Sequence, residues 1–138
     1  MIERTLSIIK PDATVRRLTK KINRKIRDSA LKIIIQKTVL LNIPQARQFY
    51  AIHEKKLFFP KLLYYITSAP VIVQVLEGEN AIVKNRVLIG ATDPRKALSG
   101  TIRKDFACDI EQNIIHGSDS QDAAKQEISF FFYFKILA

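Results

Sequence analysis

Four segments of the chain have the residue pattern of β-strands. Residues 31–41 alternate between apolar and polar side chains, with Leu31, Ile33 and Ile35 predicted on one side. Residues 71–76 are nearly all apolar, which is typical of a central strand. Shorter apolar runs at residues 5–9 and 114–115 predict two further strands. The chain therefore contains enough strands for one small sheet.

Helices are predicted between these strands from apolar residues three and four positions apart. After Pro11, the apolar side chains of one helix recur in this way, and the opposite face is basic. The apolar positions are Val15, Leu18, Ile22 and Ile26, and the basic positions are Arg16, Arg17, Lys20, Lys21, Arg24, Lys25 and Arg27. A pair of helices follows the second strand. The first member should contain Ala46, Phe49, Tyr50 and His53, and the second should start near Pro60.

Two more helices complete the pattern. A turn at residues 77–80, with Asn80 as N-cap, precedes a helix that contains Ile82, Val83, Arg86 and Val87. The last helix runs from Gln121 to about Phe132, and Ser118 with Gln121 has the spacing of a capping box. Residues 90–111 show no clear period, and a loop of that length in a small domain is usually functional or disordered.

The order of elements predicts an α+β fold. Without the helical insertion and the last helix it is βαββαβ, the ferredoxin-like arrangement, with a four-stranded antiparallel sheet and helices on one face. The long loop lies just before a histidine, His116. At 138 residues the chain should form a single domain over residues 1–138.

Composition narrows the class of protein. Hydrophobic residues make up 47% of the chain, which favours a globular fold over disorder. No apolar run reaches the ~18 residues of a membrane span, and the N-terminus has no signal-peptide pattern. The single cysteine, Cys108, cannot form an internal disulfide. These features predict a cytoplasmic protein without a membrane partner.

The net charge of +10 is unevenly distributed. Residues 1–41 carry eleven of the 23 Lys and Arg residues but only three of the 13 acidic residues. Such a basic lobe can attract nucleic acid, a membrane surface or a phosphorylated substrate. A solvated helix face explains the basic lobe better than any of these partners does.

The candidate chemistry lies in the octet Asn-Ile-Ile-His-Gly-Ser-Asp-Ser at residues 113–120. His116 lies between a short apolar strand and the start of a helix, where an anion would be favoured. Gly117 lets the backbone approach whatever His116 contacts. By spacing alone, the octet could equally be a buried histidine followed by an ordinary helix cap.

The whole octet resembles the active-site signature of the nucleoside diphosphate kinases, and the resemblance extends over residues 3–132. It implies that His116 carries a phosphoryl group from a nucleoside triphosphate such as ATP to a nucleoside diphosphate by a ping-pong mechanism. Glu127, directly or through Ser118, would hold one ring nitrogen of His116 while the other stays free.

The resemblance also implies the residues that bind the nucleotide. Lys10, Arg86 and Arg103 match phosphate-contacting positions in Ile-Ile-Lys-Pro-Asp, Asn-Arg-Val-Leu-Ile-Gly-Ala-Thr and Gly-Thr-Ile-Arg-Lys-Asp-Phe. Each of these cations alone could be a plain surface charge. Thr92 matches a phosphate ligand, and Asn113 matches the residue that bonds the sugar hydroxyl.

The remaining matches concern the base, the transferred phosphate and the metal. Tyr50 matches the tyrosine near the transferred phosphate. Phe58, with Leu62 beside it, matches the aromatic on which the base stacks, although from sequence alone core packing is the better explanation for Phe58. Stacking would tolerate any base. The resemblance also implies that Mg2+ arrives with the nucleotide phosphates and that Asp119 reaches it through water. No cluster of carboxylate, His or Cys residues has metal-site spacing, so no protein-built metal site is predicted.

Family members share a dimer that assembles into hexamers or tetramers, so a homo-oligomer is expected here. Five consecutive aromatics, residues 130–134, would leave an exposed apolar patch on a monomer. Pro94, in the loop that builds the hexamer, is present, which favours the hexamer over the tetramer.

The sequence departs from the family pattern at Lys20, Ala30 and Ala69, where glycine is frequent, and at Leu57, where proline is frequent. If Ala30 takes a left-handed conformation, stability falls by about 1 kcal/mol. The alternative function is a nucleic-acid-binding module that uses the basic first helix. It predicts salt-sensitive binding that survives loss of His116.

Overall fold

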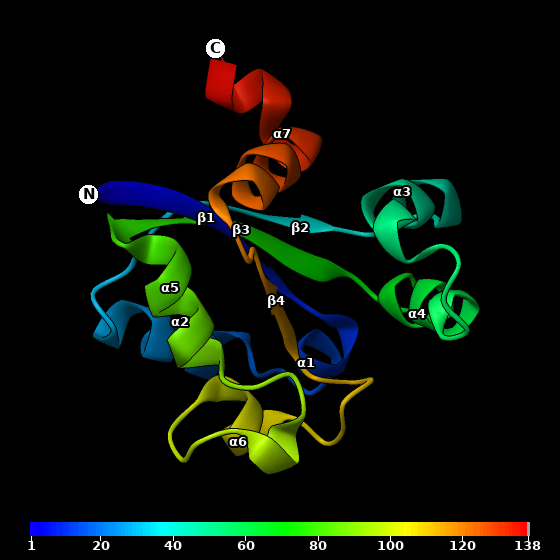
Figure 1. The fold of residues 1–138 in the computed structure, drawn as a ribbon, viewed down its shortest axis with the longest axis horizontal. Coiled ribbons are helices and arrows are strands. Elements are labelled where there is room, and N and C mark those ends of the chain that lie inside the picture. The colour runs from blue at the N-terminus through cyan, green and yellow to red at the C-terminus, as the bar shows by residue number, and fades with distance from the viewer. Residues whose placement is uncertain (138) are drawn as a thin grey trace.

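The computed structural model describes the backbone of residues 1–137 and the side chains of residues 1–132. Within this part of the chain, four antiparallel strands form one sheet in the order β2-β3-β1-β4 (Figure 1). The strands are β1 (Ile2–Ile9), β2 (Lys32–Val39), β3 (Val71–Glu79) and β4 (Ile115–Gly117). The two central strands, β1 and β3, pair along their whole length. This order and direction confirm the predicted ferredoxin-like α+β fold.

Helices cover both faces of the sheet: the helices of the predicted βαββαβ core lie on one face, as predicted, and the helical insertion and the last helix cover the other. On one face, α2 (Thr19–Asp28) and α5 (Ala81–Ile89) pack against Ile9 and Leu76. On the other, α3 (Ile43–Phe49), α4 (Phe59–Ile66) and α7 (Gln121–Leu137) pack against Leu6, Ile8 and Val73. The physical reason is that β1 and β3 carry buried apolar side chains on both faces, so each face needs a cover.

The predicted first helix is two helices with a break between them. Pro11 begins α1 (Pro11–Val15), as expected for proline in a first turn. Arg17 then adopts a left-handed conformation (φ 58°), and α2 starts at Thr19. Because of this break, Val15 is 68% exposed and does not share the buried face with Leu18. The basic residues of α2 lie on the outer side, as predicted.

A β-bulge in β2 corrects the predicted alternation. The register shifts between Ile33 and Ile35, so Ile33 pairs with Leu76 and Ile35 pairs with Val75. These two isoleucines therefore face opposite sides of the sheet, not one side. A bulge adds one residue to one strand, and this reverses the alternation beyond it.

The predicted turn at residues 77–80 is mostly strand. β3 continues to Glu79 because its last residues pair with the start of β1, where Ile2 lies opposite Glu79. The turn is confined to Asn80, which is left-handed (φ 50°). Asn80 occupies the N-cap position of α5, but its side chain makes no capping hydrogen bond.

Two helix ends differ from the predictions. α3 ends at Phe49, so Tyr50 is its C-cap and His53 lies in a short 3-10 helix, η1 (Ala51–His53). At α7, Ser120 and not Ser118 caps the helix, because the Ala123 amide donates to Ser120 Oγ over 3.1 Å. The predicted end of α7 near Phe132 coincides with a kink (φ −128°), beyond which the helix continues to Leu137.

The long segment before His116 is more ordered than its sequence suggests. It contains η2 (Pro94–Lys96), capped by Asp93, and α6 (Ile102–Phe106), capped by Thr101. These two short helices fold the segment against the end of the sheet that carries β4 (Figure 1). The segment can therefore present side chains to β4 at fixed positions.

Two predictions concerned membrane-spanning segments and the aromatic run near the C-terminus. Among the residues that the structure describes, no helix is long and apolar enough to cross a membrane. Of the aromatic run at residues 130–134, Phe130 is half-buried, and Phe131 and Phe132 are buried in this chain's own core. The side chains of Tyr133 and Phe134 lie outside the described residues.

Candidate active site

A cleft of about 1200 Å³ lies between β4, the α3–α4 insertion, the long loop and α7. The predicted site residues converge on it from six separate segments of the chain. Those that line it are Lys10, Tyr50, Phe58, Leu62, Arg86, Thr92, Arg103, Asn113, His116, Asp119 and Glu127. Ser118 is fully buried and lies behind Glu127. The sequence therefore predicted residues that the fold brings together.

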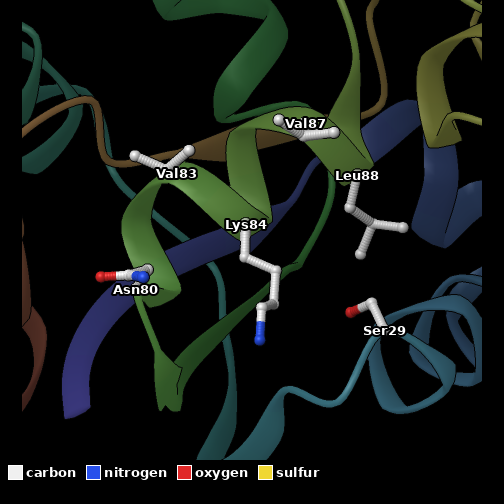
Figure 2. A pocket seen from close by; sticks show the side chains of 6 residues that line it. All are labelled: Ser29, Asn80, Val83, Lys84, Val87 and Leu88. Carbon is white, nitrogen blue, oxygen red and sulfur yellow. The ribbon is translucent and has the colours of Figure 1, made fainter. Parts of the chain in front are cut away.

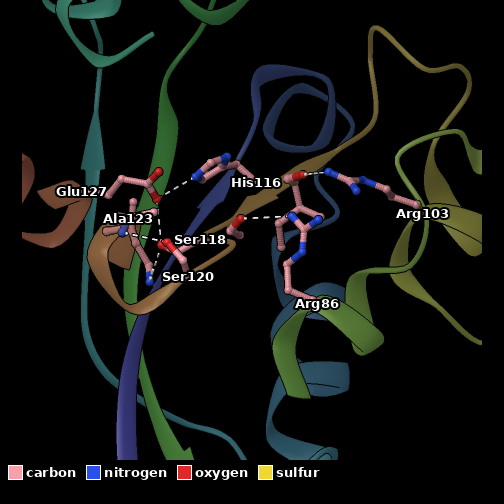
Figure 3. Close-up of polar contacts among 10 residues, drawn as sticks. Arg86, Arg103, His116, Ser118, Ser120, Ala123 and Glu127 are labelled. Atoms are coloured by element: carbon pink, nitrogen blue, oxygen red, sulfur yellow. Dashed lines mark hydrogen bonds and ion pairs between the residues drawn. The ribbon is translucent and has the colours of Figure 1, made fainter. Parts of the chain in front are cut away.

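His116 occupies the middle of β4, where it lies opposite Ile8 of β1. Its Nε2 atom lies 2.8 Å from Glu127 Oε1, and the Ser118 hydroxyl donates to the same oxygen over 2.7 Å (Figure 3). The Ser118 hydroxyl also accepts from the Leu6 amide over 3.3 Å. These contacts fix the imidazole to β1 and α7 as well as to its own strand.

The protonation of this group follows from the carboxylate. Burial alone would raise the pKa of Glu127, but the hydrogen bonds from His116 and Ser118 outweigh burial and the pKa lies below its usual value. An ionised carboxylate only accepts hydrogen bonds, so the imidazole proton sits on Nε2. Within the described part of the chain, His116 Nδ1 has no hydrogen-bond partner, and it therefore presents its lone pair to the cleft.

The backbone just before His116 is strained. Ile114 has φ 77°, a left-handed value that is unfavourable for a β-branched residue. Two hydrogen bonds hold it: its amide donates to Asp12 Oδ2 over 3.1 Å, and its carbonyl accepts from the Lys10 amide over 2.8 Å. The Tyr65 hydroxyl donates to Asp12 and so fixes the carboxylate. Such strain persists where surrounding contacts determine it, often at functional sites. Here it turns the chain between Asn113 and His116, and both side chains line the cleft.

Lys10 follows β1 directly and is buried beside the histidine strand. Its ammonium donates to Asn113 Oδ1 over 2.9 Å. Burial lowers the pKa of Lys10 to about 8, with a further lowering by Arg103 that Asp12 partly offsets. A buried, incompletely neutralised cation of this kind favours an anionic ligand in the cleft.

Two arginines stand on the other side of His116. Arg103, from α6, is only 5% exposed and donates to the carbonyls of Asn113, Gly90 and Ile115. Burial, followed by the neighbouring Arg86, lowers the pKa of Arg103 to about 10. Arg86, from α5, donates to the Gly117 carbonyl over 3.4 Å (Figure 3). A carbonyl oxygen accepts a hydrogen bond but carries no full negative charge. Both guanidinium groups therefore keep their net positive charge, and this wall of the cleft is cationic.

Tyr50 and His53 face the cleft from the insertion. The Tyr50 hydroxyl is buried without a partner among the described residues, and burial, followed by the charge of Glu127, raises the pKa of this phenol. The rings of Tyr50 and His53 stack with centroids 6.3 Å apart. His53 Nδ1 is also buried and unpartnered. Sequence analysis placed His53 on a helix but did not assign it to the site.

Phe58 lies at the start of α4 and is 44% exposed. Core packing, the alternative explanation for this residue, is therefore wrong. Its ring lies 5.6 Å from the His53 ring and 5.5 Å from Lys56 Nζ, and Leu62 lies half-buried beside it on the cleft wall. An exposed ring on the wall of a cleft offers a flat apolar surface to a planar ligand.

The remaining predicted residues lie where a ligand could reach them. Thr92 is exposed, and its carbonyl accepts from Asn113 Nδ2 over 3.3 Å. Asp119 is exposed on the cleft wall. In the described part of the chain, no three His, Cys, Asp or Glu side chains group closely enough to hold a metal ion.

A second, shallower pocket of about 430 Å³ lies on the opposite side of α5 (Figure 2). Val83, Val87 and Leu88 of α5 line it, with Lys84, Asn80 and Ser29. It contains none of the convergent polar groups of the first cleft, so we do not assign it chemistry.

Comparison with known proteins decides the family. The family model described as nucleoside diphosphate kinase matches residues 3–136. The chain belongs to the nucleoside diphosphate kinase family. It is 57% identical to the nucleoside diphosphate kinases of Acidiphilium cryptum and Paracoccus denitrificans, over 94% and 95% of this chain and 93% and 94% of those proteins.

A solved structure agrees with the sequence relatives. The crystal structure of the Aquifex aeolicus nucleoside diphosphate kinase superposes with a TM-score of 0.92, at 38% identity over 96% of both chains. The resemblance seen in the sequence is thus confirmed. The protein is an enzyme, a kinase that transfers the terminal phosphate of a nucleoside triphosphate to a nucleoside diphosphate.

Three residues of this nucleoside diphosphate kinase site were missed from sequence. Asp12 and Tyr65 hold the strained Ile114, and His53 extends the aromatic wall. Asp12 stands in the quoted motif Ile-Ile-Lys-Pro-Asp, so its place beside Lys10 was the available signal. Nothing in the sequence links Tyr65 to Asp12, because 53 residues separate them and the contact exists only after folding.

Proposed function

We propose that His116 is the nucleophile and that the reaction is ping-pong. The carrying observation is the pairing of His116 Nε2 with the ionised Glu127, which leaves Nδ1 free in the cleft. In the first half-reaction, the Nδ1 lone pair attacks the terminal phosphorus of ATP. The bond from that phosphorus to the bridging oxygen breaks, and the nucleoside diphosphate leaves. A second nucleoside diphosphate then attacks the phosphohistidine and regenerates neutral His116.

Glu127 and the cations supply the electrostatics of this step. When Nδ1 gains the phosphoryl group, the ring becomes positively charged, and Glu127 stabilises that charge through Nε2–H. Lys10, Arg86 and Arg103 would bind the phosphate oxygens, with Thr92 as a neutral ligand and Tyr50 beside the transferred phosphate. Phosphoryl transfer depends mostly on such positioning and charge.

The rest of the nucleotide would follow the cleft outward. Asn113 would bond the sugar hydroxyl, and the base would stack on Phe58 beside Leu62. Mg2+ would be carried by the nucleotide phosphates, whose negative charge it neutralises, and Asp119, exposed on the cleft wall, would meet it through water.

The test is phosphate exchange between ATP and a second nucleoside diphosphate, measured at varied concentrations of both. Parallel double-reciprocal plots are expected, since one site serves both substrates in turn. His116→Ala should abolish exchange. Full exchange in His116→Ala, or intersecting plots in the unaltered protein, would refute the mechanism.

We also propose that residues 1–138 act as one domain within a symmetric homo-oligomer built from a dimer, with the hexamer favoured over the tetramer. Pro94 is buried in η2, where it would shape the loop for contact with neighbouring subunits. The tail supports oligomerisation less than its sequence suggested, since Phe131 and Phe132 are buried in this chain. Light scattering at micromolar concentration should give the mass of six chains, and the mass of one 15.8 kDa chain would contradict the proposal.

The nucleic-acid-binding alternative gains no specific support. Most basic side chains of α2 are exposed, as they would be on any solvated helix face, and Lys25 is half-buried in an ion pair with Asp105. The family assignment explains the chain without a role for these residues in nucleic-acid binding.

A further inference from the structure

One polar row crosses the sheet on the face that α2 and α5 cover. Gln36 of β2 lies opposite Gln74 of β3, Gln74 lies opposite Ser7 of β1, and Ser7 lies opposite Gly117 of β4. Most of the surrounding residues on this face are apolar, including Ile9 and Leu76, but Thr5 of β1 is also buried there. Buried polar side chains inside such a layer need hydrogen-bond partners.

At the β2 end, the row is satisfied by α2. Gln74 Nε2 donates to Asn23 Oδ1 over 2.6 Å and to Gln36 Oε1 over 2.8 Å, and Asn23 Nδ2 donates to Gln36 Oε1 over 3.1 Å. These three amides join one helix to two strands. They show that the row is a built polar network at this end.

At the β4 end, the polar atoms have no partner among the residues with described side chains. They are Gln74 Oε1, Ser7 Oγ and both amide atoms of Asn85 on α5. All three residues are 0% exposed. The Asn85 amide lies against Gly117, with Nδ2 2.8 Å from the point where a Cβ would be. Ser7 is the cross-strand neighbour of that same Gly117.

We propose that ordered internal water bonds Ser7, Gln74 and Asn85, and that this hydrated cluster positions the strand that carries His116. A buried water makes two to four hydrogen bonds, and this group offers donors and acceptors from three elements. Asn85 does not line the cleft, so it touches no substrate and is a positioning residue. It acts through Gly117, next to His116, and its neighbour Arg86 bonds the Gly117 carbonyl.

Gly117 contributes to this positioning of the histidine strand. A side chain there would meet Asn85 and Ile89 at 2.8 and 2.7 Å, so only glycine lets α5 approach the histidine strand so closely. From the sequence, Gly117 was predicted to let the backbone approach whatever His116 contacts in the cleft. The structure adds a role on the opposite face, as the surface on which Asn85 rests.

The first test is a double-mutant cycle with Asn85→Ala, Ser7→Ala and the double variant. The positioning role rests on the proposed function of His116. Turnover is therefore measured, and the phosphate label on His116 is measured separately. Each single change should lower kcat about 3- to 10-fold, with KM within about twofold, and the double variant should lose little more than the larger single loss.

Thr5→Val is the matched control. Thr5 is equally buried and its hydroxyl is equally unpartnered, but it lies opposite Leu76, away from Gly117. It should shift the melting temperature and leave kcat unchanged. Unchanged kcat in both single variants, or losses that simply multiply in the double variant, would overturn the positioning role. If the unaltered protein carries no phosphate label on His116, the proposed function is refuted instead.

The second test observes the water directly in the unaltered protein. Magnetisation transfer from long-lived water to the amide of Ser7 or Gly117 is expected in NMR, and it should disappear in Asn85→Leu, which fills the site with an apolar side chain. Absence of any such transfer in the unaltered protein would overturn the proposal even if the variants lose activity.

Discussion

The two ends of the cleft are built in different ways. At the phosphate end (Lys10, Arg103, Asn113, His116 and Glu127), buried and half-buried side chains are joined by hydrogen bonds to the backbone or to one another. At the base end (His53, Phe58 and Leu62), the rings of His53 and Phe58 meet at a tilt without a hydrogen bond between them, and Phe58 is 44% exposed. The neighbouring Ile52 and Leu57 are 87% and 101% exposed.

This difference matches the demands of the reaction. Phosphoryl transfer needs charges held in fixed positions before the substrate arrives, and burial among carbonyls provides this. Accepting many bases needs a flat surface without polar groups that select one edge pattern. With the roles proposed above, the hydrogen-bonded and strained part of the cleft would hold the reacting phosphate, which is the same in every substrate, and the exposed Phe58 ring would meet the base, which varies.

The largest expected effect is at Lys10. Lys10→Met should lower kcat/KM by about 10²–10³-fold, because it removes a positioned phosphate donor. In the unaltered protein, phosphate binding should weaken as pH rises through about 8, where Lys10 loses its proton. Lys21→Met, which removes an exposed charge on α2, should have almost no effect on kcat/KM. Equal losses in both variants would mean that net charge alone matters.

Lys10→Met should also stabilise the fold. The pKa of Lys10 is lower in the folded chain (about 8) than the ordinary 10.5, so folding disfavours its charged form, and unfolding free energy rises with pH between those two values. Below pH 8 the variant avoids this cost and should be more stable by roughly 1–2 kcal/mol, after allowing for the lost bond to Asn113. Denaturant unfolding at pH 7 measures this, and a less stable variant would contradict it.

Glu127→Gln should reduce kcat about 10- to 100-fold, a range typical for partners that orient a functional histidine. A neutral amide neither fixes the Nε2–H tautomer nor stabilises the charged ring. Asp122→Asn on the same helix removes a charge without touching His116 and is the control. A full-activity Glu127→Gln variant would show that the free Nδ1 does not depend on this contact.

At the base end, Phe58→Ala should weaken all nucleotides by a similar amount, roughly 1–3 kcal/mol. Its free energy of unfolding should change little, since the ring is 44% exposed. Binding of ADP, GDP and CDP by calorimetry measures this, with Leu57→Ala as the control. A loss confined to one base would show that the base end reads an edge and that the contrast between the two ends is wrong.

The smallest expected effect is on stability, at Ala30, which lies outside both ends of the cleft. Ala30 has φ 66°, the left-handed value for which glycine is suited, as the sequence comparison anticipated. Ala30→Gly should raise the free energy of unfolding by up to about 1 kcal/mol without changing kcat. Ala91→Gly, at an exposed residue that is not left-handed, should destabilise slightly. If both substitutions destabilise, backbone strain at Ala30 is not limiting.

Sequence predicted the framework because strands and helices follow local periodicity. β1, α5 and the helical insertion could be placed from apolar spacing alone, and the site residues followed from the family motifs. The bulge in β2 could not be predicted, because it depends on pairing with β3. The extension of β3 through Glu79 likewise requires its partner at Ile2.

Two features around the site could not be predicted from the sequence, because they too depend on tertiary contacts. Ser118 has the spacing of a capping residue, yet its hydroxyl bonds Glu127, and Ser120 takes the cap. The two roles compete for one hydroxyl, and tertiary contact decides between them. Asn85 stands in an unremarkable helix, and only the approach of Gly117 shows that it is buried against the histidine strand.

The most direct test of the account is to identify the atom of His116 that takes the phosphate. The protein is incubated with labelled ATP without acceptor, separated, and examined by phosphorus NMR with correlation to the imidazole protons. The proposed mechanism predicts one acid-labile, alkali-stable phosphate on Nδ1 of His116, because Glu127 is hydrogen-bonded to Nε2. Phosphate on Nε2, on a serine, or on no residue of the protein would contradict it.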